Sequence, residues 1–246
     1  MLLRRVIEHV RDQNWTAVAI DFVIVVLGVF MGIQVQGAYQ NQREQQLVED
    51  YLHRMHADVV LSISGTQETK KFVAKNLENL LHVISSTAEC SIADDKKDTF
   101  ANGIFHMGKA IPAQFVNGTL SELRASGRLL LLKNSELRDA INETVRVHEY
   151  IKSVWPSFTA RVGLNRDYID SKVIYLFDRT VNGFTNIKWN EIDIEFETVC
   201  NDRIFKSRLS SLKRSASVNI DWLDRNLKAF ESLKTSLEKE LKIKSS

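Results

Sequence analysis

Residues that break regular secondary structure are scarce in this chain. Only two prolines and ten glycines occur among its 246 residues. An all-β domain needs turn residues about every 8–12 positions, so this scarcity argues against an all-β fold. The chain is still long enough for one domain with a sizeable hydrophobic core.

Motifs of enzymes and of nucleic-acid-binding proteins are also missing. No Gly-x-Ser-x-Gly, His-Glu-x-x-His or phosphate-binding glycine loop occurs. The formal net charge is only +2, and no basic stripe carries interleaved aromatic residues, as a nucleic-acid interface would. The paired acids Asp193 and Glu195 are read as a charged loop. We therefore expect no enzymatic activity, no cofactor and no nucleic-acid partner.

One trio of side chains has the spacing of a metal site. Glu49, His53 and His56 would share a helical face at steps of four and three, which zinc could use. Their neighbours Leu52 and Met55 belong to an apolar stripe, so the solvated edge of a helix explains the trio equally well. No metal site is predicted.

The longest apolar run extends from Trp15 to Tyr39. Its centre, Phe22 to Ile33, contains no charged residue and no side-chain amide. A bilayer core of about 30 Å needs about 20 helical residues, and the aromatic rings at both ends suit the headgroup region. A cleaved signal peptide and a buried core helix are the alternatives. The residues after the run offer a poor cleavage site, so we expect an uncleaved, single-pass anchor.

Basic residues around this run predict its orientation. Arg4, Arg5 and Arg11 precede it, whereas Arg43 and Arg54 follow it among acidic residues. Short basic flanks stay in the cytoplasm. We therefore expect a short cytoplasmic N-terminus (1–15), a transmembrane anchor (16–39) and a periplasmic domain (40–246).

Two long stretches of the remaining chain have helical periodicity. Apolar residues recur at steps of three and four from Gln42 to about Ala88, directly after the anchor, and again from Asn201 to Lys242. The predicted fold class is all-α: one N-terminal transmembrane helix that continues into an extracytoplasmic antiparallel helical bundle.

Local signals predict several helix ends between these stretches. Thr119 and Glu122 have the spacing of a capping box, and Gly127 is placed to end that helix in the left-handed conformation. Asn134 or Ser135 can cap the helix that follows.

Farther along, the prediction is less regular. Trp155-Pro156 should break or bend the helix that follows Ser135, with helical periodicity resuming to about Phe177. Thr185 to Phe196 reads as a loop with one short extended piece.

The two cysteines are predicted to lie at the same end of the bundle. Cys90 closes the first external helix and Cys200 opens the last one. Outside the cytoplasm they can form a disulfide; two buried thiols are the other interpretation. No Cys-x-x-Cys pair suggests redox catalysis.

Three residues of the anchor are candidates for helix association. Gly28 and Gly32 form a small-xxx-small pair that lets two helices approach closely, although glycine is common in such segments. Asp21 lies about six residues inside the aromatic boundary, where an ionised carboxylate is costly. It could pair with a basic residue of a partner or reach toward Arg11 at the interface.

Two segments carry a resemblance to a known family. One contains Asp21, Gln34, Tyr51, Leu52, Arg54, Met55 and Asp58; the other contains Glu122, Leu123, Ser126, Gly127, Leu137 and Arg138. Both are similar to segments of a large family of uncharacterised bacterial single-pass membrane proteins. The resemblance implies a bacterial envelope location and no particular activity.

These observations lead to two main functional hypotheses, beside an enzyme or metal-handling protein in which Glu49, His53 and His56 would have to converge with a further ligand. The first is an inner-membrane protein whose helical domain is an interaction or scaffold module. Its expected partners are the lipid bilayer, a second copy bound through the transmembrane helix, and an unidentified protein. The alternative is a periplasmic sensor or ligand-binding bundle. Because about 15 cytoplasmic residues cannot hold an output domain, such a sensor would have to act through a membrane partner.

Overall fold

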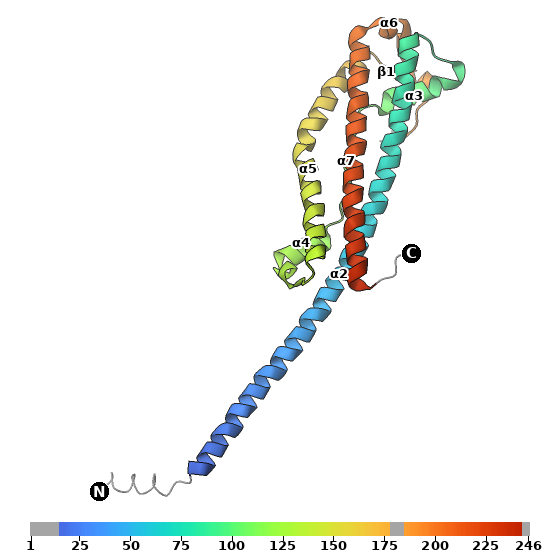
Figure 1. The fold of residues 1–246 in the computed structure, drawn as a ribbon. Helices are drawn as coiled ribbons and strands as arrows, with labels where there is room; N and C mark the ends of the chain where they lie inside the picture. The colour runs from blue at the N-terminus through green and yellow to red at the C-terminus, as the bar shows by residue number, and fades with distance from the viewer. Residues whose placement is uncertain (1–14, 178–184, 243–246) are drawn as a thin grey trace. The chain divides into compact units, whose positions relative to one another are not determined.

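A computed structural model describes residues 15–177 and 185–242 (Figure 1). Over these residues the chain is mostly helical, with two strands of two residues each. The fold class is therefore all-α, in agreement with the scarcity of proline and glycine. The chain divides into a first unit that ends at Asp50 and a second unit that begins at Tyr51.

The longest element is α2 (Trp15–Glu89), which contributes residues 51–89 to the second unit. The other elements follow in the order η1 (Asp94–Lys96), α3 (Lys97–His106), α4 (Gly118–Ala125), η2 (Arg128–Leu131), α5 (Ser135–Asp170), β1 (Ile174–Tyr175), η3 (Trp189–Glu191), β2 (Ile192–Asp193), α6 (Phe196–Asn201) and α7 (Arg203–Leu241). Strands β1 and β2 pair antiparallel, with Ile174 opposite Asp193.

Helices α5 and α7 lie side by side and run in opposite directions (Figure 1). Between them, the Thr144 hydroxyl donates a hydrogen bond to the Ala229 carbonyl at 3.2 Å. On α2, the Lys70 ammonium lies 2.6 Å from the Asp224 carboxylate of α7. Most of the predicted apolar stripe of the last helix is buried, from Phe205 to Leu237, whereas Ala216 and Ile220 are half-buried.

Two predicted helix ends are confirmed. The Asn134 side chain caps α5 by accepting a hydrogen bond from the Leu137 amide at 3.2 Å. Gly127 follows α4 with φ +69°, a left-handed conformation that glycine adopts without steric cost. Both features are encoded by neighbouring residues: Asn134 caps an amide three residues later, and Gly127 directly follows the last turn of α4.

The predicted capping box of α4 is wrong. The helix is preceded by Asn117, whose side chain forms no capping hydrogen bond; the Thr119 amide of its first turn donates to Asp58 of α2. The Glu122 carboxylate instead accepts hydrogen bonds from Tyr51 at 2.8 Å and Arg54 at 3.0 Å. The carboxylate that the local sequence pattern predicted as a cap therefore forms tertiary hydrogen bonds instead.

Helix α5 continues through Pro156, ends at Asp170 and does not extend to Phe177. Proline inside a helix costs about 3 kcal/mol. On either side of it, Ile151 and Phe158 are buried, and this apolar burial offsets the cost. The predicted extended piece is β2; its partner β1 and the short helix α6 were not predicted.

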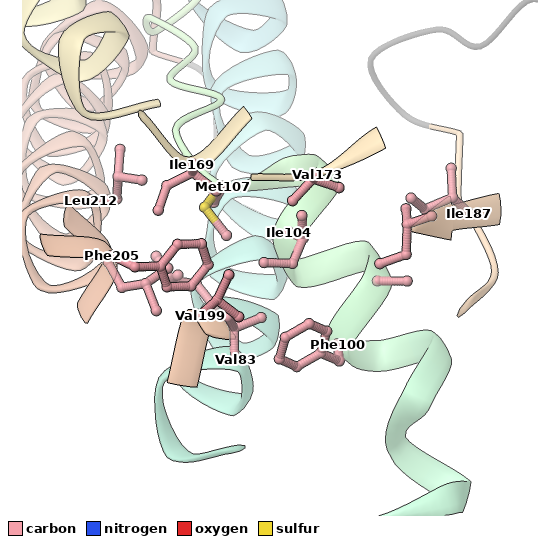
Figure 2. Close-up of a cluster of buried hydrophobic side chains, with 14 of the residues drawn as sticks. Val83, Phe100, Ile104, Met107, Ile169, Val173, Ile187, Val199, Phe205 and Leu212 are labelled. Carbon is pink, nitrogen blue, oxygen red and sulfur yellow. The ribbon is translucent and has the colours of Figure 1, made fainter. Parts of the chain in front are cut away.

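The largest hydrophobic cluster lies at one end of the second unit. We call this the disulfide end: it comprises α3, both strands, α6, the C-terminal part of α5, and the parts of α2 and α7 near Cys90 and Cys200. Figure 2 shows Val83, Phe100 and Ile104 pointing toward one another, with Val199 and Phe205 beside them. All five are essentially inaccessible to solvent.

Gly103 allows α3 to approach α2 closely. A Cβ atom at this position would lie 2.5 Å from Val83 Cγ2 and 2.6 Å from the Asn79 carbonyl oxygen. One contact is with backbone, which cannot rotate away. Only glycine therefore fits here without a shift of one helix.

The end of α3 is held by an arginine of α5. Arg166 donates through one terminal nitrogen to the carbonyls of Ile104 and Met107, both at 2.7 Å. Its Nε also donates to Asp170 at 2.7 Å. The last carbonyls of a helix have no partners of their own, so Arg166 satisfies groups that would otherwise be unpaired.

Residues 109–117 form no helix or strand, yet their backbone is hydrogen-bonded. Thr66 and Ser62 of α2 accept from the amides of Gln114 and Val116 at 3.2 and 2.9 Å. The Asn219 side chain of α7 both donates to and accepts from the backbone of Ile111. Side chains of two long helices thus replace the partners that a sheet would supply.

Candidate functional site

The apolar stretch of the first unit is exposed along its length. From Phe22 to Ile33, every large hydrophobic side chain is between 48% and 68% accessible. Within the described residues, one helix is long and apolar enough to cross a membrane, and none of its apolar part is buried. Soluble proteins rarely leave such a continuous surface in water.

Gly28 and Gly32 lie on this exposed helix. A Cβ atom built at either position would have no neighbour within 4 Å, so the first unit itself supplies nothing that packs against them. The side chain of Asp21 lies outside the described residues, as do Arg4, Arg5, Arg11 and the rest of the predicted cytoplasmic N-terminus. The structure does not test the association hypothesis.

A cluster of polar side chains joins α4 and η2 to the start of the second unit. The Tyr51 hydroxyl donates to Glu122 at 2.8 Å and accepts from Arg128 at 2.8 Å. The Arg54 guanidinium donates to Glu122 at 3.0 Å and lies 4.7 Å from the centre of the Tyr51 ring. We call the region around this cluster, formed by α4, η2 and the adjacent part of α2, the Tyr51 end.

The charges of the Tyr51 end favour an ionised carboxylate. The Tyr51 hydroxyl, helped by Arg54, holds the pKa of the Glu122 carboxyl below its usual range. Nearby, Asp58 accepts from the Thr119 amide at 3.1 Å. Residues of the two segments of the predicted family resemblance, such as Tyr51 and Glu122, 71 positions apart in sequence, therefore meet at this end.

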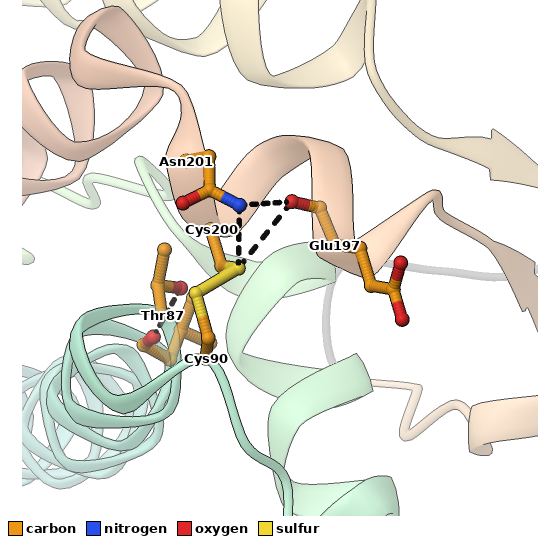
Figure 3. Close-up of a disulfide and its surroundings, with 6 residues drawn as sticks. Thr87, Cys90, Glu197, Cys200 and Asn201 are labelled. Carbon is orange, nitrogen blue, oxygen red and sulfur yellow. Dashed lines mark hydrogen bonds between the residues drawn. A yellow bond between two sulfur atoms is a disulfide. The ribbon is translucent and has the colours of Figure 1, made fainter.

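Cys90 and Cys200 form a disulfide at the opposite end of the second unit (Figure 3). Their Cα atoms are 5.3 Å apart, and 110 positions separate them in sequence. Cys200 is buried on α6, whereas Cys90 is exposed just beyond the last residue of α2. The bond therefore links the end of α2 to the segment that leads into α7.

Cys90 also has an unusual backbone conformation. Its φ is +48°, in the left-handed region, and the following Ser91 amide donates to the Ser86 carbonyl at 3.1 Å. This is the helix ending in which glycine normally occupies the left-handed position. A non-glycine residue there costs about 1–2 kcal/mol of conformational energy.

A second polar cluster lies inside the disulfide end. His106 is 2% exposed; one ring nitrogen lies 3.0 Å from the Thr185 carbonyl and the other 3.1 Å from the Lys109 ammonium. A neutral ring that donates to Thr185 and accepts from Lys109 satisfies both contacts. Burial, with the charge of Lys109, lowers the pKa of His106 to about 4.

Burial, together with the charge of Arg166, also lowers the pKa of Lys109, to about 8. Its ammonium lies 4.0 Å from the centre of the Phe105 ring, a favourable cation–π distance. These contacts hold the turn after α3 in place, which explains the buried histidine without a catalytic role.

The candidate metal trio is not assembled. His56 lies 3.4 Å from Glu238 of α7, and hydrogen bonding to Lys234 is the main reason that the pKa of Glu238 is lowered. Among the described residues, no group of three His, Cys, Asp or Glu side chains is arranged to hold a metal ion.

Sequence reasoning missed the roles of Tyr51, Glu122 and Arg166, whose partners lie about 60 to 70 residues away.

Comparison with known proteins adds no assignment: no protein-family model, curated protein or solved structure matches this chain. The family resemblance therefore stays a prediction.

Proposed function

We propose that this chain is a single-pass protein of a bacterial inner membrane whose helical bundle is an interaction or scaffold module in the periplasm. The observation that carries the proposal is the exposed apolar stretch from Phe22 to Ile33. A helix satisfies its own backbone hydrogen bonds, so a bilayer can surround it on all sides. In water the same surface would drive aggregation.

The disulfide supports the proposed orientation. Disulfides persist in oxidising compartments such as the periplasm and are rare in the cytoplasm. The Cys90–Cys200 bond therefore supports a periplasmic location for the second unit. The cations Arg4, Arg5 and Arg11 that precede the apolar stretch favour the same orientation.

The proposed scaffold associates through its transmembrane helix. Gly28 and Gly32 are one helical turn apart and have open space beside them, so a second copy could pack closely on this face. Asp21 lies seven residues before Gly28, where it would pair with a basic group of a partner.

The experiment uses the full chain in bacterial membranes. We expect the protein to stay in the membrane fraction after an alkaline carbonate wash and to form dimers on crosslinking. Gly28→Leu combined with Gly32→Leu should reduce the crosslinked dimer several-fold, because each leucine keeps the two helices apart. Gly37→Leu is the matched control, since Gly37 also has open space beside it.

Release of the protein by carbonate would rule out the anchor. An unchanged dimer in the double variant, or an equal loss in the Gly37 control, would remove the glycine pair from the proposal. Mass spectrometry of other crosslinked proteins would identify a scaffold partner.

A second function, ligand binding with signalling through a membrane partner, is favoured by one observation. The described residues include a groove between α5 and α7, lined partly by arginine and serine.

A further inference from the structure

A groove of about 600 Å³ lies between α5 and α7 in the second unit. Its walls come from residues 150–165 of α5 and 211–222 of α7. Sites for small molecules usually measure about 300–1,000 Å³, so the groove is large enough for a ligand of one or two rings.

Helix composition explains why the groove exists. Pro156 interrupts the backbone hydrogen bonds of α5, and this helix bows away from α7 along its middle (Figure 1). The facing positions carry small side chains, namely Ser153, Ser157, Ser211 and Ser215. Serine fills little of the space that leucine would occupy at a helix–helix contact, so the two helices leave a gap.

Aromatic side chains line one part of the groove. The rings of Phe158 and Trp222 have centroids 4.8 Å apart, and Trp155 packs against both. Phe158 is 7% exposed, so this surface is held by the core. It offers a rigid apolar wall on which a flat ring can stack.

Guanidinium groups line another part. Arg161 of α5 and Arg214 of α7 are exposed, and neither pairs with a carboxylate among the described residues. Asn165 also lines the groove and is 6% exposed; its carbonyl accepts from Arg208 at 3.0 Å. Asn165 thereby links a lining position of the groove to a further guanidinium.

No acidic side chain lines the groove; Asp221, at the end of the α7 wall, forms an ion pair with Arg225. The sequence contains no Asp or Glu between Ser153 and Arg166, or between Arg203 and Ile220. The cations within these stretches are Arg161, Arg166, Arg203, Lys206, Arg208, Lys213 and Arg214. Of these, only Arg166 forms an ion pair among the described residues. The groove therefore has a positive potential that its own walls do not neutralise.

We propose that this groove binds a small aromatic anion, with its carboxylate or phosphate at Arg161 and Arg214 and its ring against Phe158 and Trp222. Arginine is suited to both kinds of anion because its planar guanidinium donates two parallel hydrogen bonds. The site lies within the second unit and does not depend on the proposed membrane location.

The test is calorimetric titration of the purified full chain in detergent, with protein-free micelles as the blank. The probe is 2-naphthoate. Its neutral isostere 2-naphthamide keeps the ring without the charge, and acetate keeps the charge without the ring. We expect 2-naphthoate to bind about tenfold more tightly than 2-naphthamide, because it gains charge-assisted hydrogen bonds. Acetate should bind more weakly than either.

Substitutions locate the site. Arg161→Gln and Arg214→Gln should each weaken 2-naphthoate binding about tenfold and leave 2-naphthamide unchanged. Lys213→Gln is the matched control: it removes the same charge from the next position of α7, outside the groove lining. Its effect should stay below about twofold. All three side chains are exposed, so unchanged thermal melting should accompany the variants.

Three results would overturn the proposal. These are no binding of 2-naphthoate at millimolar concentration, equal affinity for the amide, and equal weakening by Lys213→Gln. The last result would mean that the overall positive charge of α7, not the groove, attracts the anion.

Discussion

The two ends of the second unit are held together in different ways. At the disulfide end, buried side chains from α2, α3, α5, α6 and α7 form one hydrophobic cluster, and Cys90–Cys200 adds a covalent link. At the Tyr51 end, α4 and η2 are held by Glu122 and Arg128, and Leu130 is 83% exposed. Both ends bury apolar side chains, Leu120 and Leu123 of α4 included. The disulfide end adds a covalent link, whereas the Tyr51 end adds charged contacts near water.

This difference predicts different sensitivities. Apolar burial and a disulfide respond to cavities, overpacking and reduction. Exposed charged contacts respond to salt and to loss of a single partner. Tyr51 and Glu122, which belong to the two segments of the predicted family resemblance, both lie in the polar cluster of the Tyr51 end.

Reduction of the disulfide should have the largest effect. Opening a loop of 110 residues should lower the free energy of unfolding by about 4–5 kcal/mol in the chain-entropy model. Urea titration with and without reductant measures the loss, and Cys200→Ser should reproduce it. Hydrogen exchange should rise in α3 and α6 before it rises in α4. Equal increases at both ends would contradict the comparison.

Overpacking of the hydrophobic cluster should come next. In Gly103→Ala the new methyl group meets Val83 and the Asn79 backbone, and we expect a net destabilisation of about 1–2 kcal/mol. Gly163→Ala is the control, because a Cβ atom there meets nothing within 4 Å. The control should be stabilised by about 0.5–1 kcal/mol. Thermal or urea unfolding of both variants gives the comparison; equal effects would show that α3 tolerates a shift.

Loss of one hydroxyl at the Tyr51 end should have the smallest effect. Tyr51→Phe removes the hydrogen bonds to Glu122 and from Arg128 and should cost about 1 kcal/mol. Faster hydrogen exchange should be confined to α4 and η2. Tyr150→Phe serves as the control, since that side chain is 57% exposed and forms no hydrogen bond among the described residues. A change at the disulfide end would show that the two ends are coupled.

The parts of the fold that were predicted depend on short-range patterns. The cap at Asn134, the left-handed Gly127 and the apolar stripe of α7 are each encoded within a few turns of helix. The parts that were missed depend on long-range partners. Glu122 fits a local cap equally well until Tyr51, 71 positions earlier, is brought beside it.

The groove between α5 and α7 also depends on contacts between segments distant in sequence and could not be predicted. The absence of acidic residues between Arg203 and Ile220 can be read from the sequence. The sequence does not show that this stretch faces a groove. That follows only from the packing of α5 beside α7, which places Arg161 near Ser211 and Ser215. Likewise, Pro156 predicted a bend or a break, and the burial on both sides of it decides in favour of a continuous helix.

Several backbone groups are hydrogen-bonded by side chains that lie much later in the sequence, which affects the order in which contacts can form during synthesis. The carbonyls at the end of α3 can accept from Arg166, and the Ile111 amide can donate to Asn219, only after these later residues have been synthesised. Cys90 likewise has no disulfide partner until Cys200 has been synthesised. The cluster of Tyr51, Glu122 and Arg128 needs only the chain as far as Arg128. As the ribosome adds residues from the N-terminus, this cluster has all its partners before the disulfide can form.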